Sequence, residues 1–320
     1  METAKAIVLL LIGFIVLIKS SDFFVDAISS IATNFKMSKM MIALTVAAFG
    51  TCAPELAISL QSISSNAGDI ALSNVLGSNV VNILLIVGLT ALIHPIKVKI
   101  DVTKKELPIL VVVTSLFTLS LLLHYFGVYD PGFILNRQDG FMFIGLFILF
   151  MLYIVSVIRT KQGVFEHEAP KYNLFLSILI TIICCTLIVF SSDLVVENAK
   201  IFATNIGVST KLITMTFVVI GTSLPEMTMT VIAAKKEEFD IALGNIIGTN
   251  IFNIGVVLGL PLMIYGGFSS TSFNLIDIFA VPVAALSLFI FAKNDKLLSK
   301  KEGAVMLILF VMYYTYLFIV

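Results

Sequence analysis

Two carboxylates stand inside apolar segments of the chain, each directly after a proline. Glu55 follows Pro54 in GTCAPELAIS, and Glu226 follows Pro225 in GTSLPEMTMT. Proline lacks a backbone donor and glutamate carries a charge, and both are costly in lipid, where no water replaces a lost hydrogen bond. Charged residues inside membrane spans are functional by default. The two Pro-Glu pairs therefore indicate a site within the membrane.

Oxygen-bearing groups accompany both carboxylates at helical spacing. Thr51 lies four residues before Glu55, and Thr222 lies four before Glu226, so each hydroxyl shares a helical face with its carboxylate. The proline of the first segment also frees backbone carbonyls in the preceding turn, around Ala48. In the next apolar segments, Ser78 and Asn82 are again four residues apart, as are Thr249 and Asn253.

The composition is that of a polytopic membrane protein. Of 320 residues, 59% are hydrophobic and only 12% are charged, whereas about a quarter of the residues of a soluble domain are charged. The 20 basic and 20 acidic residues cancel, and no nucleic-acid partner is expected. Cys52, Cys184 and Cys185 all lie in apolar runs, and their spacing favours neither a disulfide framework nor a metal site.

The apolar runs predict an all-α membrane protein with ten transmembrane helices. A span takes about 20 helical residues, and the first and sixth runs are long enough to require strong tilt. Helices 2 and 7, which hold the prolines, are expected to be broken. The predicted spans are 6–31, 40–64, 70–94, 107–126, 141–158, 173–202, 211–234, 240–264, 274–292 and 303–319.

The lysines and arginines of the loops predict the orientation. Fifteen fall after spans one, three, five, seven and nine, and four fall on the opposite side. The basic side is expected to be cytoplasmic. The protein should therefore be a multi-pass protein of the cell membrane with both termini outside.

The chain contains an internal repeat with a shift of 171 residues. From Ser20 to Ile83, 23 of 64 positions are identical to their counterparts without a gap, and the matches include Asp, Pro, Glu, Gly and Asn. Five spans separate the copies, so the second is inserted upside down. Inverted repeats are typical of secondary transporters, which bind substrate near the midplane between the repeats. The predicted units are a first five-helix repeat over 1–160, a cytoplasmic linker over 161–172 and a second repeat over 173–320.

Folded about a pseudo-twofold axis, the polar residues of both copies would form one cage of oxygens. Ca²⁺ takes about six to eight oxygen ligands and tolerates irregular geometry. Two glutamates would neutralise one Ca²⁺, and the same oxygens could hold Na⁺ instead. The sequence offers no cluster of histidines or cysteines suited to a softer metal. With alternating access, a cage of this kind would exchange ions rather than leak them.

At these residues the chain resembles the Ca²⁺/cation antiporter superfamily, specifically its sodium/calcium exchanger branch, in a form without a large regulatory domain. The motifs that carry the resemblance are GTCAPE with GSNVVN and GTSLPE with GTNIFN. The resemblance implies Na⁺/Ca²⁺ antiport, with spans one and six sliding past the core. It implies cation ligands at Thr51, Glu55, Ser78, Asn82, Thr222, Ser223, Glu226, Thr249 and Asn253, together with the backbone oxygen of Ala48.

The sequence departs from the family pattern at two positions. Family members often have serine where this chain has Cys52, and potassium-dependent members often have aspartate where it has Asn253. Potassium-dependent exchange and Ca²⁺/H⁺ exchange remain alternatives, although the run GNIIGTN lacks the carboxylate typical of the proton-coupled branch.

Other classes of function fit less well. A cation channel with the same cage is an alternative, whereas an enzyme is not expected because the chain contains no HExxH motif. Beyond the transported ions and the lipid bilayer, no cofactor or partner is implied, and a monomer is expected. Asn74 and Asn245 are expected to cap or brace helices, and Asp22 and Asp193, near the ends of spans one and six, to have an interfacial or helix-pairing role. The histidines at 94, 124 and 167 are expected to lack partners.

Overall fold

The computed structural model describes residues 2–127, 134–160, 169–205, 220–269 and 273–319. Six helices run without a break: α1 (Glu2–Asn34), α7 (Leu107–Tyr125), α8 (Arg137–Thr160), α9 (Leu174–Asn205), α14 (Leu275–Asp295) and α15 (Lys300–Ile319). The remaining helices are interrupted, and several contain wide π-helical turns, labelled η. The interrupted elements are α2 (Lys39–Ile42), η1 (Ala43–Ala47), α3 (Ala48–Thr51), α4 (Ala53–Ser64), α5 (Gly68–Val80), η2 (Val81–Val87), α6 (Gly88–Ile93), η3 (Val102–Glu106), α11 (Leu224–Lys235), α12 (Phe239–Phe252), η4 (Asn253–Leu258) and α13 (Gly259–Tyr265).

Within the described residues, seven helices are long and apolar enough to cross a membrane. An eighth is formed if Lys39–Thr51 and Ala53–Ser64, which meet at 51°, are counted as one broken span. The predicted break in the second span is therefore confirmed. The predicted seventh span, 211–234, begins outside the described residues.

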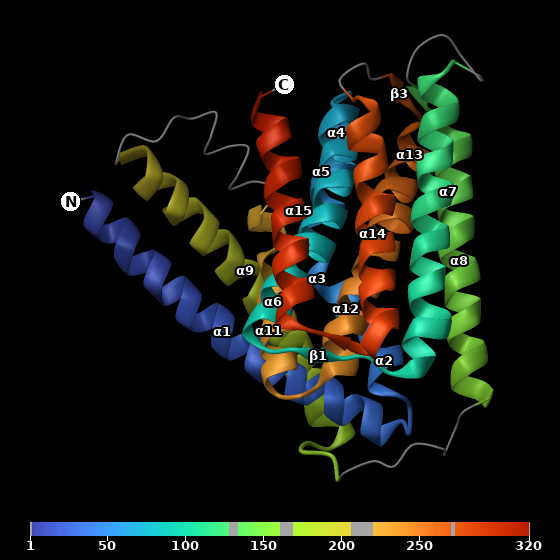
Figure 1. Ribbon diagram of the computed structural model, residues 1–320. Helices are drawn as coiled ribbons and strands as arrows, with labels where there is room; N and C mark the ends of the chain where they lie inside the picture. The colour runs from blue at the N-terminus through green and yellow to red at the C-terminus, as the bar shows by residue number, and fades with distance from the viewer. Residues whose placement is uncertain (1, 128–133, 161–168, 206–219, 270–272, 320) are drawn as a thin grey trace.

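The helices α1 and α9 form a pair that slants across the other long helices (Figure 1). They contain 33 and 32 residues, which agrees with the tilt predicted from their length. Of the described spans, Phe239–Tyr265 is the most buried: 83% of its 18-residue apolar window is buried, compared with 28% for the window in α1. The core of the molecule therefore lies around α12 and η4, and the α1–α9 pair lies at its periphery.

The backbone repeats its irregular features at the same shift of 171 residues as the sequence. Cys52 (φ −80°, ψ 5°) and Ser223 (φ −89°, ψ 6°) adopt one conformation at the two helix breaks. Asn66 and Glu237 both have φ of 59°, a left-handed conformation that few residues other than glycine adopt. These equivalences show that the two copies fold alike at the positions that interrupt their helices.

Among the described residues, four two-residue strands join the first half of the chain to the second, a detail that the all-α prediction did not include. In antiparallel pairs, β1 (Ile96–Lys97) meets β4 (Leu297–Leu298), and β2 (Ile134–Leu135) meets β3 (Phe268–Ser269). In Figure 1, β1 lies near the lower end of the molecule and β3 near the upper end. Each pair therefore ties the first copy to the second at one end of the bundle.

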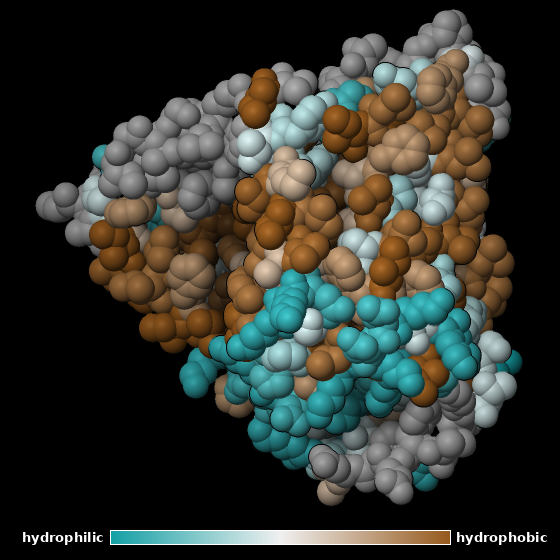
Figure 2. Space-filling model, in the orientation of Figure 1, coloured by the Kyte–Doolittle hydropathy of each residue, from teal (hydrophilic) through white to brown (hydrophobic). Residues whose placement is uncertain are grey.

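The outer surface is divided by polarity. Figure 2 shows a hydrophilic band across the lower part of this face, around the place of β1, beneath a mainly hydrophobic surface. Exposed lysines of predicted cytoplasmic loops include Lys97, Lys99, Lys296, Lys300 and Lys301. Lys97 belongs to β1 and the other lysines lie within a few residues of the β1–β4 pair in the sequence, so the structure gathers these basic residues at one end.

Ion pairs tie the C-terminal half of α1 to the loop after α11. Lys236 Nζ lies 2.9 Å from Asp22 Oδ1 and 2.6 Å from Asp26 Oδ1. Asp26 also accepts a 2.6 Å hydrogen bond from Lys171, and this bond raises the pKa of the exposed Lys171 amine. The ion pair of Asp22 with Lys236 agrees with the interfacial or helix-pairing role predicted for Asp22.

Candidate cation site

Both glutamates lie in the first turn of a helix that begins at a break. Pro54 and Pro225 occupy the first turns of α4 and α11, where a missing backbone N–H costs no hydrogen bond. Glu55 and Glu226 follow directly, close to the positive end of the helix dipole. The prolines therefore start new helices, and the two breaks place both carboxylates at helix N-termini inside the protein.

The two carboxylates are fully buried and incompletely paired. Glu55 is 1% exposed and Glu226 is 0% exposed. Within the described residues, neither oxygen of Glu226 and only one oxygen of Glu55 has a hydrogen-bond partner at good geometry. Thr222 donates to Glu55, and Thr51 lies beside Glu226, so each copy supplies a hydroxyl next to the other's carboxylate. Buried charges are otherwise paired or bind a metal ion.

Further buried oxygens of the candidate set also lack partners. Asn82 and Asn253 are 0% exposed, and neither atom of either amide group is hydrogen-bonded within the described chain. Three hydroxyls share this state: those of Ser78, Ser223 and Thr249. Each unsatisfied buried polar group costs about 1–3 kcal/mol. Such a concentration of unsatisfied groups is expected at a ligand site.

Close packing of α12 on the broken second span brings the two copies together. A methyl group placed on Gly248 would lie 2.6 Å from Leu44 O and 2.9 Å from Ala48 Cβ, so only glycine allows this approach. Thr249 is the next residue on α12. The element that carries Asn82, η2, contacts α11, and η4, which carries Asn253, contacts α4. Each amide therefore comes from an element packed on the helix that bears the other copy's glutamate.

The helix breaks also place Cys52 among these groups. Its thiol is 0% exposed, lies within hydrogen-bonding reach of Thr51 and Thr249, and is close to both glutamates. The sequence pattern gave no reason to assign the cysteines to a metal site. Within the described residues, no group of three or more His, Cys, Asp or Glu side chains is placed to hold a metal ion. Cys184 packs in a hydrophobic cluster with residues of α1.

The carbonyls freed by the prolines have donors that the sequence pattern did not reveal. Gly50 O accepts a hydrogen bond from Cys185 Sγ at 3.1 Å, and Gly221 O accepts one from Ser192 Oγ at 3.3 Å. Both donors lie on α9. The predicted ligand oxygen of Ala48 accepts a bond from the Cys52 amide at 3.1 Å. Thr51 Oγ1 also lies within hydrogen-bonding distance of this oxygen, at 3.5 Å.

Two asparagines brace the site, as predicted. Asn245 donates to Thr230 Oγ1 at 3.2 Å and accepts from Thr51 Oγ1 at 3.5 Å. Asn74 donates to the backbone oxygen of Glu55 at 3.4 Å. Asn245 thus holds the side chain of Thr51 in place, and Asn74 holds the backbone of Glu55.

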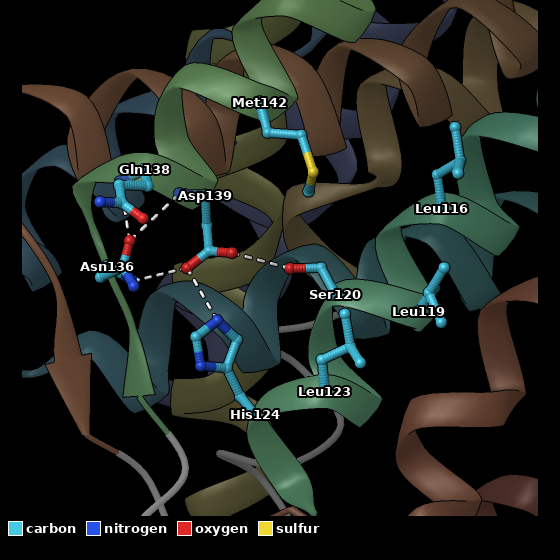
Figure 3. A pocket seen from close by; sticks show the side chains of 9 residues that line it. All are labelled: Leu116, Leu119, Ser120, Leu123, His124, Asn136, Gln138, Asp139 and Met142. Carbon is cyan, nitrogen blue, oxygen red and sulfur yellow. Dashed lines mark hydrogen bonds and ion pairs between the residues drawn. The ribbon is translucent and has the colours of Figure 1, made fainter. Parts of the chain in front are cut away.

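A separate polar cluster lies where α7 ends and α8 begins (Figure 3). Asp139 accepts hydrogen bonds from Ser120 Oγ and the Asn136 amide, both at 2.8 Å, and pairs with His124 Nε2 at 3.0 Å. They line a cavity of about 220 Å³. The prediction that His124 lacks a partner is therefore wrong. Because Asp139 caps the first turn of α8, the cluster has a structural role in joining the two helices.

Comparison with known proteins repeatedly finds sodium/calcium exchangers. The family model described as "Sodium/calcium exchanger protein" matches residues 5–156 and 176–319. The sodium/calcium exchanger MaX1 of Methanosarcina acetivorans is 31% identical over 97% of both chains. The inner membrane protein YrbG of Escherichia coli is 37% identical over 82% of this chain and 81% of its own. A solved structure of the sodium-calcium exchanger NCX_Mj, soaked with Na⁺ and Sr²⁺, matches with a TM-score of 0.81 at 28% identity and covers 97% of both chains.

Proposed function

Because the chain belongs to the sodium/calcium exchanger family, whose members are multi-pass membrane transporters rather than enzymes, we propose that it exchanges Na⁺ for Ca²⁺. The family and the likeness to NCX_Mj support cation antiport. Alternating access to a single buried site would couple the two ions, since each would have to leave before the other binds.

One observation carries the proposal: two buried glutamates from different copies have carboxylate oxygens without hydrogen-bond partners among the described residues. Glu55 and Glu226 lie close enough to repel each other. A divalent cation between them would remove this repulsion and supply the missing partner. Two Na⁺ ions would neutralise the same charge, so both transported ions suit the carboxylate pair.

The remaining ligands in this proposal are oxygens of the same cage. They all belong to one chain, so we propose a monomer as the unit of transport. The proposed set is Thr51, Ser78, Asn82, Thr222, Ser223, Thr249 and Asn253, with the backbone oxygen of Ala48. Within the described residues, Ser78, Asn82, Ser223, Thr249 and Asn253 are buried and have side-chain atoms without partners. Thr51 and Thr222 lie beside the two carboxylates, which also supports the set.

The proposed architecture has ten spans in two inverted repeats, over 1–160 and 173–320, joined by the linker 161–172. The backbone features that recur after 171 residues support the repeat, as do the strand pairs at opposite ends. Part of the linker, 161–168, and the start of the seventh span lie outside the described residues. We place the lysine-rich end in the cytoplasm and both termini outside.

The test is ⁴⁵Ca²⁺ uptake into liposomes that contain the purified full chain. An outward Na⁺ gradient should drive uptake, whereas a pH gradient should not, and K⁺ should make no difference. Uptake driven only by the pH gradient would replace Na⁺ with H⁺ in the proposal, and a requirement for K⁺ would add potassium. Ca²⁺ conductance that needs no counter-ion would indicate a channel.

Two matched variants connect this flux to the site. Glu226→Gln keeps the size of the side chain but removes one cage charge, so Na⁺-driven uptake should be lost. Glu237→Gln makes the same change at an exposed loop position and should leave uptake unchanged. Equal flux in the two variants would remove Glu226 from the ligand set.

A further inference from the structure

A line of polar contacts holds the C-terminal half of α1 to the second copy. Asp22, Asp26 and Ser29 follow one another at helical spacing, so they lie on one face of α1. Lys236, in the loop between α11 and α12, pairs with both aspartates and donates to the backbone oxygen of Asp22 at 2.7 Å. Glu238, in the same loop, accepts a hydrogen bond from Ser29 Oγ at 3.2 Å. This loop therefore fastens α1 at the end of the bundle that holds β1 (Figure 1).

The equivalent loop of the first copy carries no charge. Residues 236–238 read KEE, whereas residues 65–67, their counterparts at the shift of 171, read SNA. The acidic character of the helix does recur, because Glu197 on α9 is the equivalent of Asp26 and is exposed. Both copies thus have an acidic helix, but only the second copy has a lysine in the loop that binds such a helix.

The two helices also differ in their packing. The helix α1 packs against α11, whereas α9 makes no comparable contact with α4, the equivalent helix of the first copy, among the described residues. In Figure 1, the C-terminal end of α9 stands away from α4. Alternating access moves one part of an inverted repeat against the other. The mirror state is therefore the one in which α9 packs against α4 and α1 has left α11.

The ion pairs of Lys236 belong to only one of these two states. The Lys236 and Asp26 side chains are 25% and 18% exposed, so their pair is partly shielded from water. Departure of α1 from α11 would break it, and closure at the other end would bring Glu197 towards the neutral Ser65. No ion pair would replace those that were lost. A difference of this size matters because two conformations of one protein are often closely balanced.

We propose that the pairs of Lys236 with Asp22 and Asp26 form a one-sided latch, which closes the cytoplasmic end and makes the outward-open state the resting state. This inference rests on the proposed antiport function, since it names the regulation of the same site. The ion-free protein would take up its cation from outside. Salt screens partly exposed charges, so the latch would weaken as the cytoplasmic ionic strength rises.

The first experiment measures the populations of the two states. Spin labels are attached at Lys36→Cys, at the end of α1, and Lys301→Cys, at the start of α15, because both positions are exposed and neither belongs to the latch. The purified full chain carries serine at its three native cysteines. Electron spin resonance then gives the distances of the docked and released positions of α1.

Removal of the lysine should release α1. Lys236→Met should raise the ratio of released to docked molecules on the order of tenfold, because it removes two partly exposed ion pairs. Lys235→Met makes the same change at an exposed neighbour and should leave the ratio unchanged. An equal ratio in the two variants overturns the proposal.

A second variant adds the missing lysine to the other loop, and it does not remove any existing ion pair. Ser65→Lys places a cation where Glu197 would arrive in the mirror state, so it should also favour release of α1. Adding Glu197→Gln should cancel this shift. Ser64→Lys, at the exposed counterpart of Lys235, is the control. An unchanged ratio in Ser65→Lys, or an equal shift in Ser64→Lys, overturns the proposal.

Salt provides a readout that a purely structural role of Lys236 would not change. Raising choline chloride from about 50 mM to about 500 mM should increase the released fraction, because screening weakens the ion pairs. The increase should be smaller in Lys236→Met, and an equal increase overturns the proposal. Failure of the antiport proposal is distinct: no Na⁺-driven ⁴⁵Ca²⁺ uptake would be seen, while the shifts in distance would remain.

Discussion

Replacing Gly248 with alanine should separate the two copies at the site. A methyl group on Gly248 would lie 2.6 Å from Leu44 O and 2.8 Å from Leu44 Cα. Both are backbone atoms, so no rotation of a side chain can relieve the contact. Non-bonded atoms normally stay about 3.5 Å apart, so α12 would have to move away from η1 by roughly 1 Å.

The magnitude follows from two opposing effects. Overpacking of this kind costs about 1–3 kcal/mol, and sometimes more. Alanine in place of glycine within a helix stabilises the helix by about 1 kcal/mol, because alanine has the higher helix propensity. Gly145, on α8, provides the matched control, because a methyl group there meets nothing within 4 Å among the described residues. Gly145→Ala should therefore gain helix stability without the cost of overpacking.

The assay is thermal unfolding of the purified full chain in detergent, with and without Ca²⁺. Gly248→Ala should lower the apparent Tm by several degrees, whereas Gly145→Ala should leave it unchanged or raise it. A bound ion stabilises the native state by RT ln(1 + [L]/Kd). The Ca²⁺-induced rise in Tm should persist in Gly145→Ala and shrink in Gly248→Ala, because Thr249 moves with α12.

One result would refute this reasoning. If Gly248→Ala matched Gly145→Ala both in stability and in its response to Ca²⁺, the close contact of α12 with the broken second span would not hold the site together. If Gly248→Ala lowered the Tm but kept the Ca²⁺-induced rise, the close packing would contribute to stability and not to Ca²⁺ binding. Thr249 would then be removed from the proposed ligand set.

Three further outcomes are expected. Lys236→Met should destabilise the protein by about 1 kcal/mol, because it removes two ion pairs of α1, whereas Lys235→Met, at an exposed neighbour, should have little effect in the same unfolding assay. Asp139→Asn should cost about 1–3 kcal/mol, since it leaves buried donors without a carboxylate, and equal stability would contradict the role of the cluster. Acidification should slow Na⁺-driven ⁴⁵Ca²⁺ uptake, because protons compete with cations for carboxylate oxygens, and flux that is constant down to pH 5 would count against a carboxylate cage.

The polar positions of the repeat made much of the site predictable. Unrelated apolar segments share many Leu, Ile and Val residues, but they do not align Pro54 and Glu55 with a second Pro-Glu pair. Spacing of four residues then placed hydroxyls beside the carboxylates. The structure confirms the break at Cys52 and the burial of both glutamates.

The contacts between distant segments were not predictable. His124 and Asp139 belong to different helices, and nothing in either segment indicates that they meet. Cys185 lies in an apolar run, and its role as a donor to Gly50 O can be recognised only once α9 is packed on the second span. The π-helical turns η2 and η4 could not be recognised from composition either, since their sequences, VNILLIV and NIGVVL, are largely apolar like those of the flanking α-helices.

The two donors on α9 have a mechanical consequence. Cys185 and Ser192 are seven residues apart, so they lie on one face of the helix about 10 Å from each other. One helix, α9, therefore donates a hydrogen bond to a backbone carbonyl at each of the two helix breaks. A shift of α9 along its axis would break both hydrogen bonds in the same movement. The two broken helices would then respond together to the position of one helix.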